Sequence, residues 1–242
     1  MKERIQKILS EQGYCSRRAA EQIIREGRVK VNGRAAELGD KIDILKDTLS
    51  VDGANIEFKK RMQTVYYMLH KPRGYVTTMD DPHATKTIRD LMDGIEGRVY
   101  PVGRLDKDSE GLIILTNDGD LTNRLTHPSS KISKLYRVTV RPAPVEEQLI
   151  ALSSGVVLDD GYKTKETVIR VAASEPNRGV LEIVLYEGKN RQIRRMCDAV
   201  GLEVVRLKRT SLGPLKLGML KPGQIRELKK EEVNALRNAV TK

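Results

Sequence analysis

The sequence predicts an α+β protein in two parts, a small domain in residues 1–60 and a larger one in residues 61–242. In the first part, apolar residues at helical spacing are followed by two hairpin signals. In the second, short segments of alternating polarity recur between turns that contain Gly or Pro, a pattern typical of strands. The charged and aperiodic stretch 59–64 lies between the two parts, and we expect it to be a linker.

The small domain is predicted to hold two short helices and two hairpins. Residues 3–12 carry apolar residues at helical spacing, and Ser16 precedes a second such segment, 17–26, as an N-cap would. Asn32-Gly33 then follows alternating valines, which is a strong signal for a tight hairpin turn. A second hairpin is expected at 49–54.

The larger domain is predicted to alternate strands with a few short helices. Thr87, Asp120 and Asn190 are expected to cap three of these helices. The expected strands are 65–69, 75–78, 99–102, 112–115, 134–140, 166–171 and 180–186, and the expected helices are 88–92, 121–125, 143–152 and 191–200.

Composition points to a polyanionic partner. The 242 residues carry a formal net charge of +11, which favours binding to nucleic acid, although a merely basic protein would have the same charge. Cys15 and Cys197 are far apart, and the three histidines form no paired motif, so we expect no metal site. Glycine-rich nucleotide loops are also missing from the sequence, so we expect no cofactor. No apolar run is long enough to span a membrane, and we expect a soluble, cytoplasmic protein.

Three segments of the larger domain carry candidate chemistry. Asp106 lies in a Gly-bounded loop, 103–111, just before an apolar strand. Tyr136 shares one side of its predicted strand with two valines, and Arg191 and Arg194 lie near the start of a predicted helix. Taken singly, each has a simpler interpretation: a solvated turn residue, a core tyrosine and a solvated helix face.

The first 60 residues resemble the S4 RNA-binding domain. The resemblance rests on the segments 16–20 (SRRAA) and 27–33 (GRVKVNG). It implies that basic side chains on the helices and on the turn after them contact RNA phosphates, which position an RNA without reading its sequence. These residues are Arg17, Arg18, Arg28 and Lys30.

Together, the segments 103–106 (GRLD), 134–136 (KLY) and 187–196 (EGKNRQIRRM), behind an S4-like domain, resemble the RsuA/RluB family of ribosomal RNA pseudouridine synthases. The resemblance covers nearly the whole chain and is greatest for members that act on the large subunit. It implies a mixed, mainly antiparallel catalytic domain whose central sheet carries Asp106 and Tyr136 beside one cleft. His70 departs from the family, where Asn is expected.

The resemblance also implies roles for single residues. Asp106 would be the catalytic carboxylate, acting either by covalent attack or by forming a glycal, and Arg194 would pair with it and keep it ionised. Tyr136 would pack on the target base. Arg104 would hold the flipped nucleotide, and Lys189 and Arg191 would contact RNA.

We therefore expect an enzyme that isomerises a uridine of ribosomal RNA, without a metal or cofactor. Its partner would be ribosomal RNA or a pre-ribosomal particle, and we expect a monomer. The alternative is a non-catalytic RNA-binding factor for ribosome assembly. A glycosidase-like or nuclease-like enzyme would need a second catalytic carboxylate, and we interpret Asp108 and Glu110 as solvated loop residues instead.

Overall fold

A computed structural model of the chain describes residues 2–58, 63–95 and 97–240. The chain divides into two compact units, Met1–Gln63 and Thr64–Lys242. Residues 59–62 of the expected linker lie outside the described residues. The two units are described separately below.

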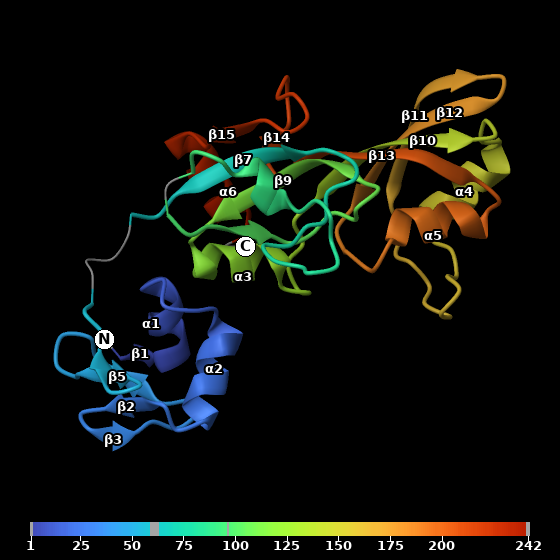
Figure 1. Cartoon of the computed structure of the whole chain (residues 1–242). Coiled ribbons are helices and arrows are strands. Elements are labelled where there is room, and N and C mark those ends of the chain that lie inside the picture. Colours follow the sequence, from blue (N-terminus) through green and yellow to red (C-terminus); the bar gives the residue numbers. More distant parts are fainter. Residues whose placement is uncertain (1, 59–62, 96, 241–242) are drawn as a thin grey trace. The chain divides into compact units, whose positions relative to one another are not determined.

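The small unit packs two helices against short strands (Figure 1). The helices are α1 (Ile5–Glu11) and α2 (Arg17–Arg25), and the strands are β1 (Glu3–Arg4), β2 (Val29–Val31), β3 (Arg34–Ala35), β4 (Lys41–Ile42), β5 (Leu49–Val51) and β6 (Ala54–Asn55). Four of the strands form a sheet in the order β3-β2-β5-β6, and β1 pairs with β4. The first helix is shorter than predicted because its first two expected residues pair with β4 instead.

Local chemistry explains why these elements form where they do. The Ser16 hydroxyl accepts a hydrogen bond from the N–H of Ala19, as expected of an N-cap. Asn32 and Gly33 both have positive φ, 49° and 81°, which a two-residue hairpin of the primed type requires. Asp52 and Gly53 repeat this conformation at the second hairpin, with φ of 51° and 83°.

The described part of the large unit is built on a nine-stranded sheet. Its main path runs β11-β12-β10-β13-β9-β7-β15, with β14 beside β13 and β8 beside β9. The strands are β7 (Tyr66–Lys71), β8 (Tyr100–Val102), β9 (Glu110–Thr116), β10 (Lys134–Arg141), β11 (Val168–Glu175), β12 (Arg178–Leu185), β13 (Glu203–Leu212), β14 (Leu215–Lys216) and β15 (Ile225–Glu227). Among the strands that the structure describes in this unit, only β13 and β9 pair in parallel, so the prediction of a mixed, mainly antiparallel domain is confirmed.

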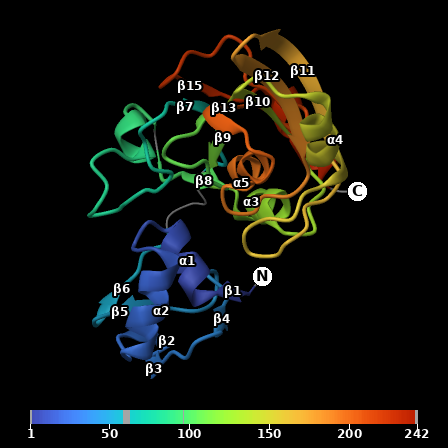
Figure 2. The same cartoon turned by 90° about the vertical axis from the view of Figure 1, so that its right-hand side faces the viewer.

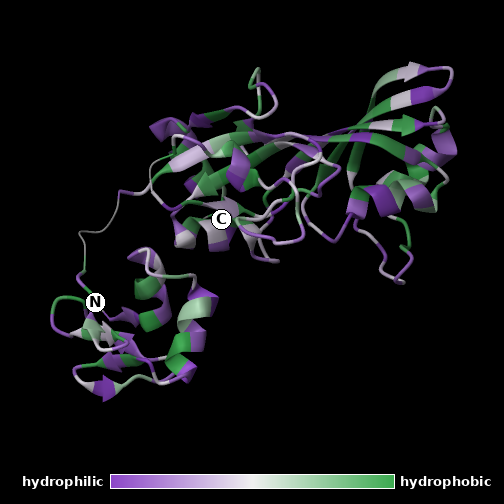
Figure 3. Ribbon diagram, in the orientation of Figure 1, coloured by the Kyte–Doolittle hydropathy of each residue, from purple (hydrophilic) through white to green (hydrophobic). Residues whose placement is uncertain are grey.

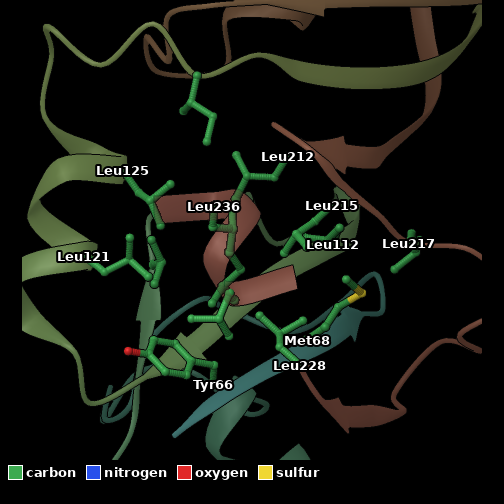
Figure 4. Close-up of a cluster of buried hydrophobic side chains, with 14 residues drawn as sticks. Tyr66, Met68, Leu112, Leu121, Leu125, Leu212, Leu215, Leu217, Leu228 and Leu236 are labelled. Carbon is green, nitrogen blue, oxygen red and sulfur yellow. The ribbon is translucent and has the colours of Figure 1, made fainter. Parts of the chain in front are cut away.

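Helices cover this sheet in two groups. The helical segments are η1 (Ile88–Leu91), α3 (Gly119–Thr126), α4 (Glu146–Ser154), α5 (Gln192–Ala199) and α6 (Lys230–Ala239). One core joins α3 and α6 to β7, β9 and the end of β13, and Figure 4 shows its side chains meeting. A second core joins α4 and α5 to β10, β12 and β13. Figure 1 shows the two groups along the length of the sheet, and Figure 2 shows the unit from the end that carries α4 and α5. Figure 3 shows hydrophobic residues along the inner strands.

Two predicted caps are wrong. The carboxylate that accepts the N–H of Leu121 at the start of α3 belongs to Asp118, because the helix begins at Gly119, one residue earlier than Asp120. At α5, the residue before the helix is Arg191 rather than Asn190, and its backbone is left-handed with φ of 47°. The third predicted cap, Thr87, is the residue directly before η1, and its N–H donates to the carboxylate of Asp90 at 2.7 Å.

The strand β13 and the helix α6 were not predicted from the sequence. β13 carries both charged and apolar residues, and its basic run at 206–209 obscures the pattern of a buried strand. It is nevertheless the central strand that joins the two halves of the sheet.

A polar cluster joins the first strand of the large unit to its last helix. The Tyr66 hydroxyl donates to Asp118 at 2.7 Å, and Arg237 of α6 donates to the same hydroxyl at 2.7 Å. Burial, followed by the bond to Asp118, raises the pKa of Tyr66 to about 12, so the hydroxyl remains protonated in ordinary buffers. The cluster joins β7, α3 and α6.

We predict that Tyr66→Phe lowers the free energy of unfolding by about 1–2 kcal/mol, because it leaves Arg237 and Asp118 without the bridging hydroxyl. Chemical denaturation would measure this change. Tyr67→Phe is the matched control, since Tyr67 is the next residue on β7 and its hydroxyl has no hydrogen-bond partner within the described ranges. Equal stability of the two variants would contradict a stabilising role for the cluster.

Candidate active site

The candidate site is built around the loop between β8 and β9, residues 103–109, which contains Asp106. Every residue of β9 is buried, so this loop is attached to one of the most rigid elements of the unit. Gly111, near the start of β9, has φ of 118° and lies against β13, where an added Cβ would be 2.2 Å from the carbonyl oxygen of Arg209. Only glycine allows this close approach of the two strands.

The sheet register relates the loop to Tyr136. Gly111 is the partner of Arg209 in the parallel pair β9–β13, and Arg209 is in turn the partner of Tyr136 in the antiparallel pair β13–β10. The strand that follows the loop is therefore two strands away from Tyr136 along one row of the sheet. Tyr136 is partly buried and packs against the same core as Val138 and Val140, as its position in the sequence predicted.

A lysine from the neighbouring strand holds the loop from inside. Lys71, at the end of β7, is fully buried, and its ammonium donates to the carbonyl oxygens of Asp106 at 2.9 Å and Ser109 at 2.8 Å, and to that of Pro72 at 3.1 Å. The backbone N–H of Gly74 donates to the carbonyl of Lys107 at 2.7 Å. The segment 71–74 thus holds the loop at the loop's backbone carbonyls, and these contacts use none of the loop's side chains.

Burial lowers the pKa of Lys71 to about 8, and the nearby carboxylates of Asp106, Asp108 and Glu110 oppose this shift only in part. Lys71 is not among the site residues that the sequence predicted. No feature of the sequence reveals that its ammonium lies beneath the Asp106 loop 35 residues away.

Arg194 lies on α5 with little exposed surface and makes contact with the other end of the loop. Its guanidinium donates to the carbonyls of Val204 at 3.0 Å and of Asp108 at 3.2 Å, and its Nε lies 3.3 Å from the Asp108 carboxylate. Arg191 donates to the same carboxylate at 3.1 Å. Burial acts to raise the pKa of Asp108, but the charges of Arg194 and Arg191 outweigh it and hold the pKa below its usual range.

This geometry corrects two expectations. Arg194 does contact the loop, but the carboxylate beside it is that of Asp108 rather than Asp106. Asp108 and Glu110 are not simply solvated either, since Glu110 is buried and pairs with Arg206 at 2.6 Å. Asp106 is partly exposed, and within the described residues its carboxylate has no hydrogen bond or ion pair.

The basic residues expected to contact RNA fall into two groups. Arg17, Arg18, Lys30 and Arg104 are exposed to solvent. The others already have partners on the surface. Arg28 makes a bidentate ion pair with Asp52, with both distances 2.7 Å. The Lys189 ammonium lies 4.5 Å from the centre of the Tyr162 ring. Arg191 donates to the Asp108 carboxylate, as described above.

Two further residues belong to the surroundings of the site. His70 is buried beside Lys71 on β7, and its Nδ1 lies 2.6 Å from the carbonyl of Leu220, to which it donates. This bond shows how histidine fits where Asn was expected. Arg209, which the sequence suggested only as part of a basic run, is buried and donates to the carbonyl of Leu112 at 2.8 Å.

In the described ranges, no group of three or more His, Cys, Asp and Glu side chains is arranged to hold a metal ion. Nor is any helix in these ranges long and apolar enough to cross a membrane.

Comparison with known proteins defines the class. Residues 65–199 match the RNA pseudouridylate synthase family, and residues 3–48 match the S4 domain. The chain therefore belongs to the RNA pseudouridine synthases and carries an amino-terminal S4 domain. The predicted order of an S4 domain followed by a pseudouridine synthase domain is confirmed, as is the prediction of an RNA-modifying isomerase.

Individual relatives narrow this class. The chain is 40% identical to the ribosomal large subunit pseudouridine synthase B of Bacillus subtilis, over 97% of this chain and 96% of that protein. It is 43% identical to an uncharacterized RNA pseudouridine synthase of Aquifex aeolicus, over 99% of this chain and 96% of that protein. A crystal structure of a pseudouridylate synthase superposes with a TM-score of 0.69 at 30% identity, covering 96% of this chain and 99% of that one.

We predict that the stability of this protein rises between pH 8 and 10.5 through Lys71. The folded-state pKa of about 8 lies below the ordinary value of 10.5, so the unfolded chain binds more protons in this window and folding is favoured as pH increases. Each pH unit between the two values contributes about 1.4 kcal/mol.

Denaturation of the wild type and of Lys71→Met at several pH values would measure this effect. The difference in unfolding free energy between the two proteins should grow by a few kcal/mol across the window in favour of the wild type. A difference that does not depend on pH would mean that the Lys71 pKa is not lowered.

Proposed function

We propose that this protein converts a specific uridine of ribosomal RNA, in the large subunit, into pseudouridine, with Asp106 as the catalytic carboxylate. The observation that carries the proposal is the contrast within one short loop. The backbone of Asp106 is held by a buried lysine, whereas its carboxylate is partly exposed and unpaired within the described residues. The names of relatives such as the Bacillus subtilis enzyme support the large subunit as the substrate.

The reaction replaces one bond by another at the same ribose carbon. The bond between C1′ and N1 of the uracil breaks, the base turns, and C1′ bonds to C5. The proton on C5 is released, and N1 takes up a proton. The Asp106 carboxylate would assist by attacking the nucleoside or by removing the C2′ proton to give a glycal. An unpaired carboxylate suits both routes, because an ion pair would have to break before the oxygen could react.

Tyr136 and Arg194 would assist from the two sides of this carboxylate. Tyr136 is partly buried on a strand in register with β9, a position that suits packing against a flipped base. Arg194 would act by holding the loop, since its bonds run to the carbonyl and carboxylate of Asp108.

The S4 domain and the basic surface would bind the RNA and offset the cost of flipping the uridine out of a stacked position. We assign phosphate contacts to Arg17, Arg18 and Lys30 in the S4 domain, and to Arg104, Lys189 and Arg191 near the candidate site. Arg28 is a weaker candidate because Asp52 already holds it. We propose that the substrate is ribosomal RNA or an assembling ribosomal particle, bound by a monomer in the cytoplasm.

Loss of the Asp106 carboxylate should abolish turnover without abolishing binding. Tritium release from [5-³H]uridine-labelled ribosomal RNA reports the reaction, because the C5 proton must leave. Asp106→Asn should lower the rate by about 10³-fold or more. The affinity for RNA should stay within a few-fold of wild type.

Asp120→Asn is the matched control, since Asp120 is exposed on α3 and outside the candidate site. Equal release by wild type and Asp106→Asn would remove Asp106 from the mechanism. If neither protein released tritium while both still bound RNA, a non-catalytic RNA-binding assembly factor would be the better description.

The double variant Arg17→Ala, Arg18→Ala should weaken RNA binding and flatten its dependence on salt. Each lost phosphate contact should reduce the slope of log K against log salt by about 0.7–0.9. Arg28→Ala should change the slope less, because its guanidinium is already paired with Asp52. Binding measured at several salt concentrations would test both, with thermal melting to confirm that each variant is folded.

A further inference from the structure

Thr77 also holds the Asp106 loop, in addition to Lys71, Gly74 and Arg194. The side-chain hydroxyl of Thr77 donates to the carbonyl of Leu105 at 2.6 Å and accepts the N–H of the same residue at 3.2 Å. A single hydroxyl therefore satisfies both backbone groups of the residue immediately before Asp106.

Thr77 is itself firmly anchored. The N–H of Val76 donates to the carbonyl of Lys86 at 2.9 Å, and the carbonyl of Val76 accepts the N–H of Ile88 at 3.0 Å. Val76 also forms an isolated parallel bridge with Thr87. The hydroxyl thus extends from the residue directly after Val76, whose N–H and carbonyl are both bonded to the segment leading into η1.

The contact is shielded from water. Thr77 is 8% exposed and Leu105 is 6% exposed, so solvent cannot easily replace the hydroxyl as the partner of these backbone groups. Removing the hydroxyl would leave a buried N–H and a buried carbonyl without partners, and the loop would have to move to satisfy them.

The position of Asp106 depends on both of its neighbouring contacts. Its own carbonyl is fixed by Lys71, and the peptide before it is fixed through Leu105 by Thr77. Catalytic groups tolerate little displacement, since a shift of about 1 Å can cost about 10²-fold in rate. A clamp on the preceding residue would therefore affect the rate more than it affects RNA binding.

We propose that Thr77 is a positioning residue for this reaction, which holds the Asp106 carboxylate in its reactive place through the backbone of Leu105. The inference rests on the proposed function of Asp106. Thr77 does not touch the reacting atoms, and its hydroxyl rather than its methyl group performs the role.

Three substitutions separate the hydroxyl from the methyl group. Thr77→Val keeps the shape of the side chain and removes both hydrogen bonds. Thr77→Ala also removes both hydrogen bonds, and its smaller side chain cannot clash with its neighbours. Thr77→Ser keeps the hydroxyl and removes the methyl group. In tritium release, Thr77→Val and Thr77→Ala should lower kcat by about 10- to 100-fold and keep KM within about two-fold of wild type. The kcat of Thr77→Ser should remain within about three-fold of wild type.

Thr164→Val is the matched control. Thr164 is also buried, and its hydroxyl accepts the N–H of Val156 at 2.9 Å, in a loop that does not contact residues 103–109 through any hydrogen bond in the described ranges. This variant should be destabilised like Thr77→Val but should keep the wild-type kcat. A loss of kcat in both would indicate a general effect of stability.

Hydrogen–deuterium exchange of the peptide that contains residues 103–109 gives a readout that does not need turnover. Exchange of the Leu105 amide should be faster in Thr77→Val and Thr77→Ala than in wild type, and close to wild type in Thr77→Ser. Unchanged exchange in the Val and Ala variants would overturn the inference even if the enzyme proved inactive on the RNA tested.

The outcomes distinguish this inference from the function on which it rests. If wild type releases tritium and the folded Val or Ala variants match it, Thr77 is not a positioning residue, although the proposed function stands. If Ser is as slow as Val, the methyl group matters and the hydroxyl clamp is wrong. If wild type and Asp106→Asn release tritium equally, the proposed role of Asp106 fails, and this inference fails with it.

Discussion

The close pairing of β9 with β13 is the contact on which the rest of the large unit depends. The register joins the two strands at only two residue pairs, Glu110 with Lys208 and Gly111 with Arg209. The absence of a side chain on Gly111 lets the backbones meet. This one parallel pairing connects the half of the sheet that carries the Asp106 loop with the half that carries Tyr136. The pairing therefore gives the two parts of the candidate site a common frame.

Around this frame, the loop is held almost entirely through its backbone. A buried ammonium, a backbone N–H and a guanidinium bind carbonyl oxygens at four of its positions, and a threonine hydroxyl binds at a fifth. Contacts of this kind fix the path of the chain and leave side chains available. They also add less to the activation free energy than ion pairs to the reactive carboxylate would, because no such pair needs to be broken during the reaction.

Three carboxylates in five residues illustrate how surroundings separate roles. Glu110 is buried and paired with Arg206, and Asp108 lies between Arg191 and Arg194. Asp106 stays partly exposed and unpaired within the described residues. Two of the three therefore contribute to structure and to the local field, and the third is left for a ligand. The S4 domain adds exposed basic groups that suit RNA phosphates and take no part in this arrangement.

The sequence by itself determined the elements whose causes are local. Ser16 caps its helix, Asn32-Gly33 forms its hairpin, and the matching motifs place an S4 domain before a pseudouridine synthase domain. Each of these depends on residues a few positions apart, whose conformational preferences can be inferred without the fold. The resemblance to the synthase family, rather than local preference, marked Asp106, Tyr136 and Arg194 as candidates.

Only the tertiary structure decided which groups meet. It assigned Arg194 to Asp108, placed Lys71 and Thr77 beneath the loop, and made the charged segment 203–212 the central strand. These contacts join residues 28 to 86 positions apart, and their partners are chosen by sheet register and burial rather than by local preference. The alternation within one strand does not show which other strand it pairs with, because the alternation is the same whichever neighbour lies beside it.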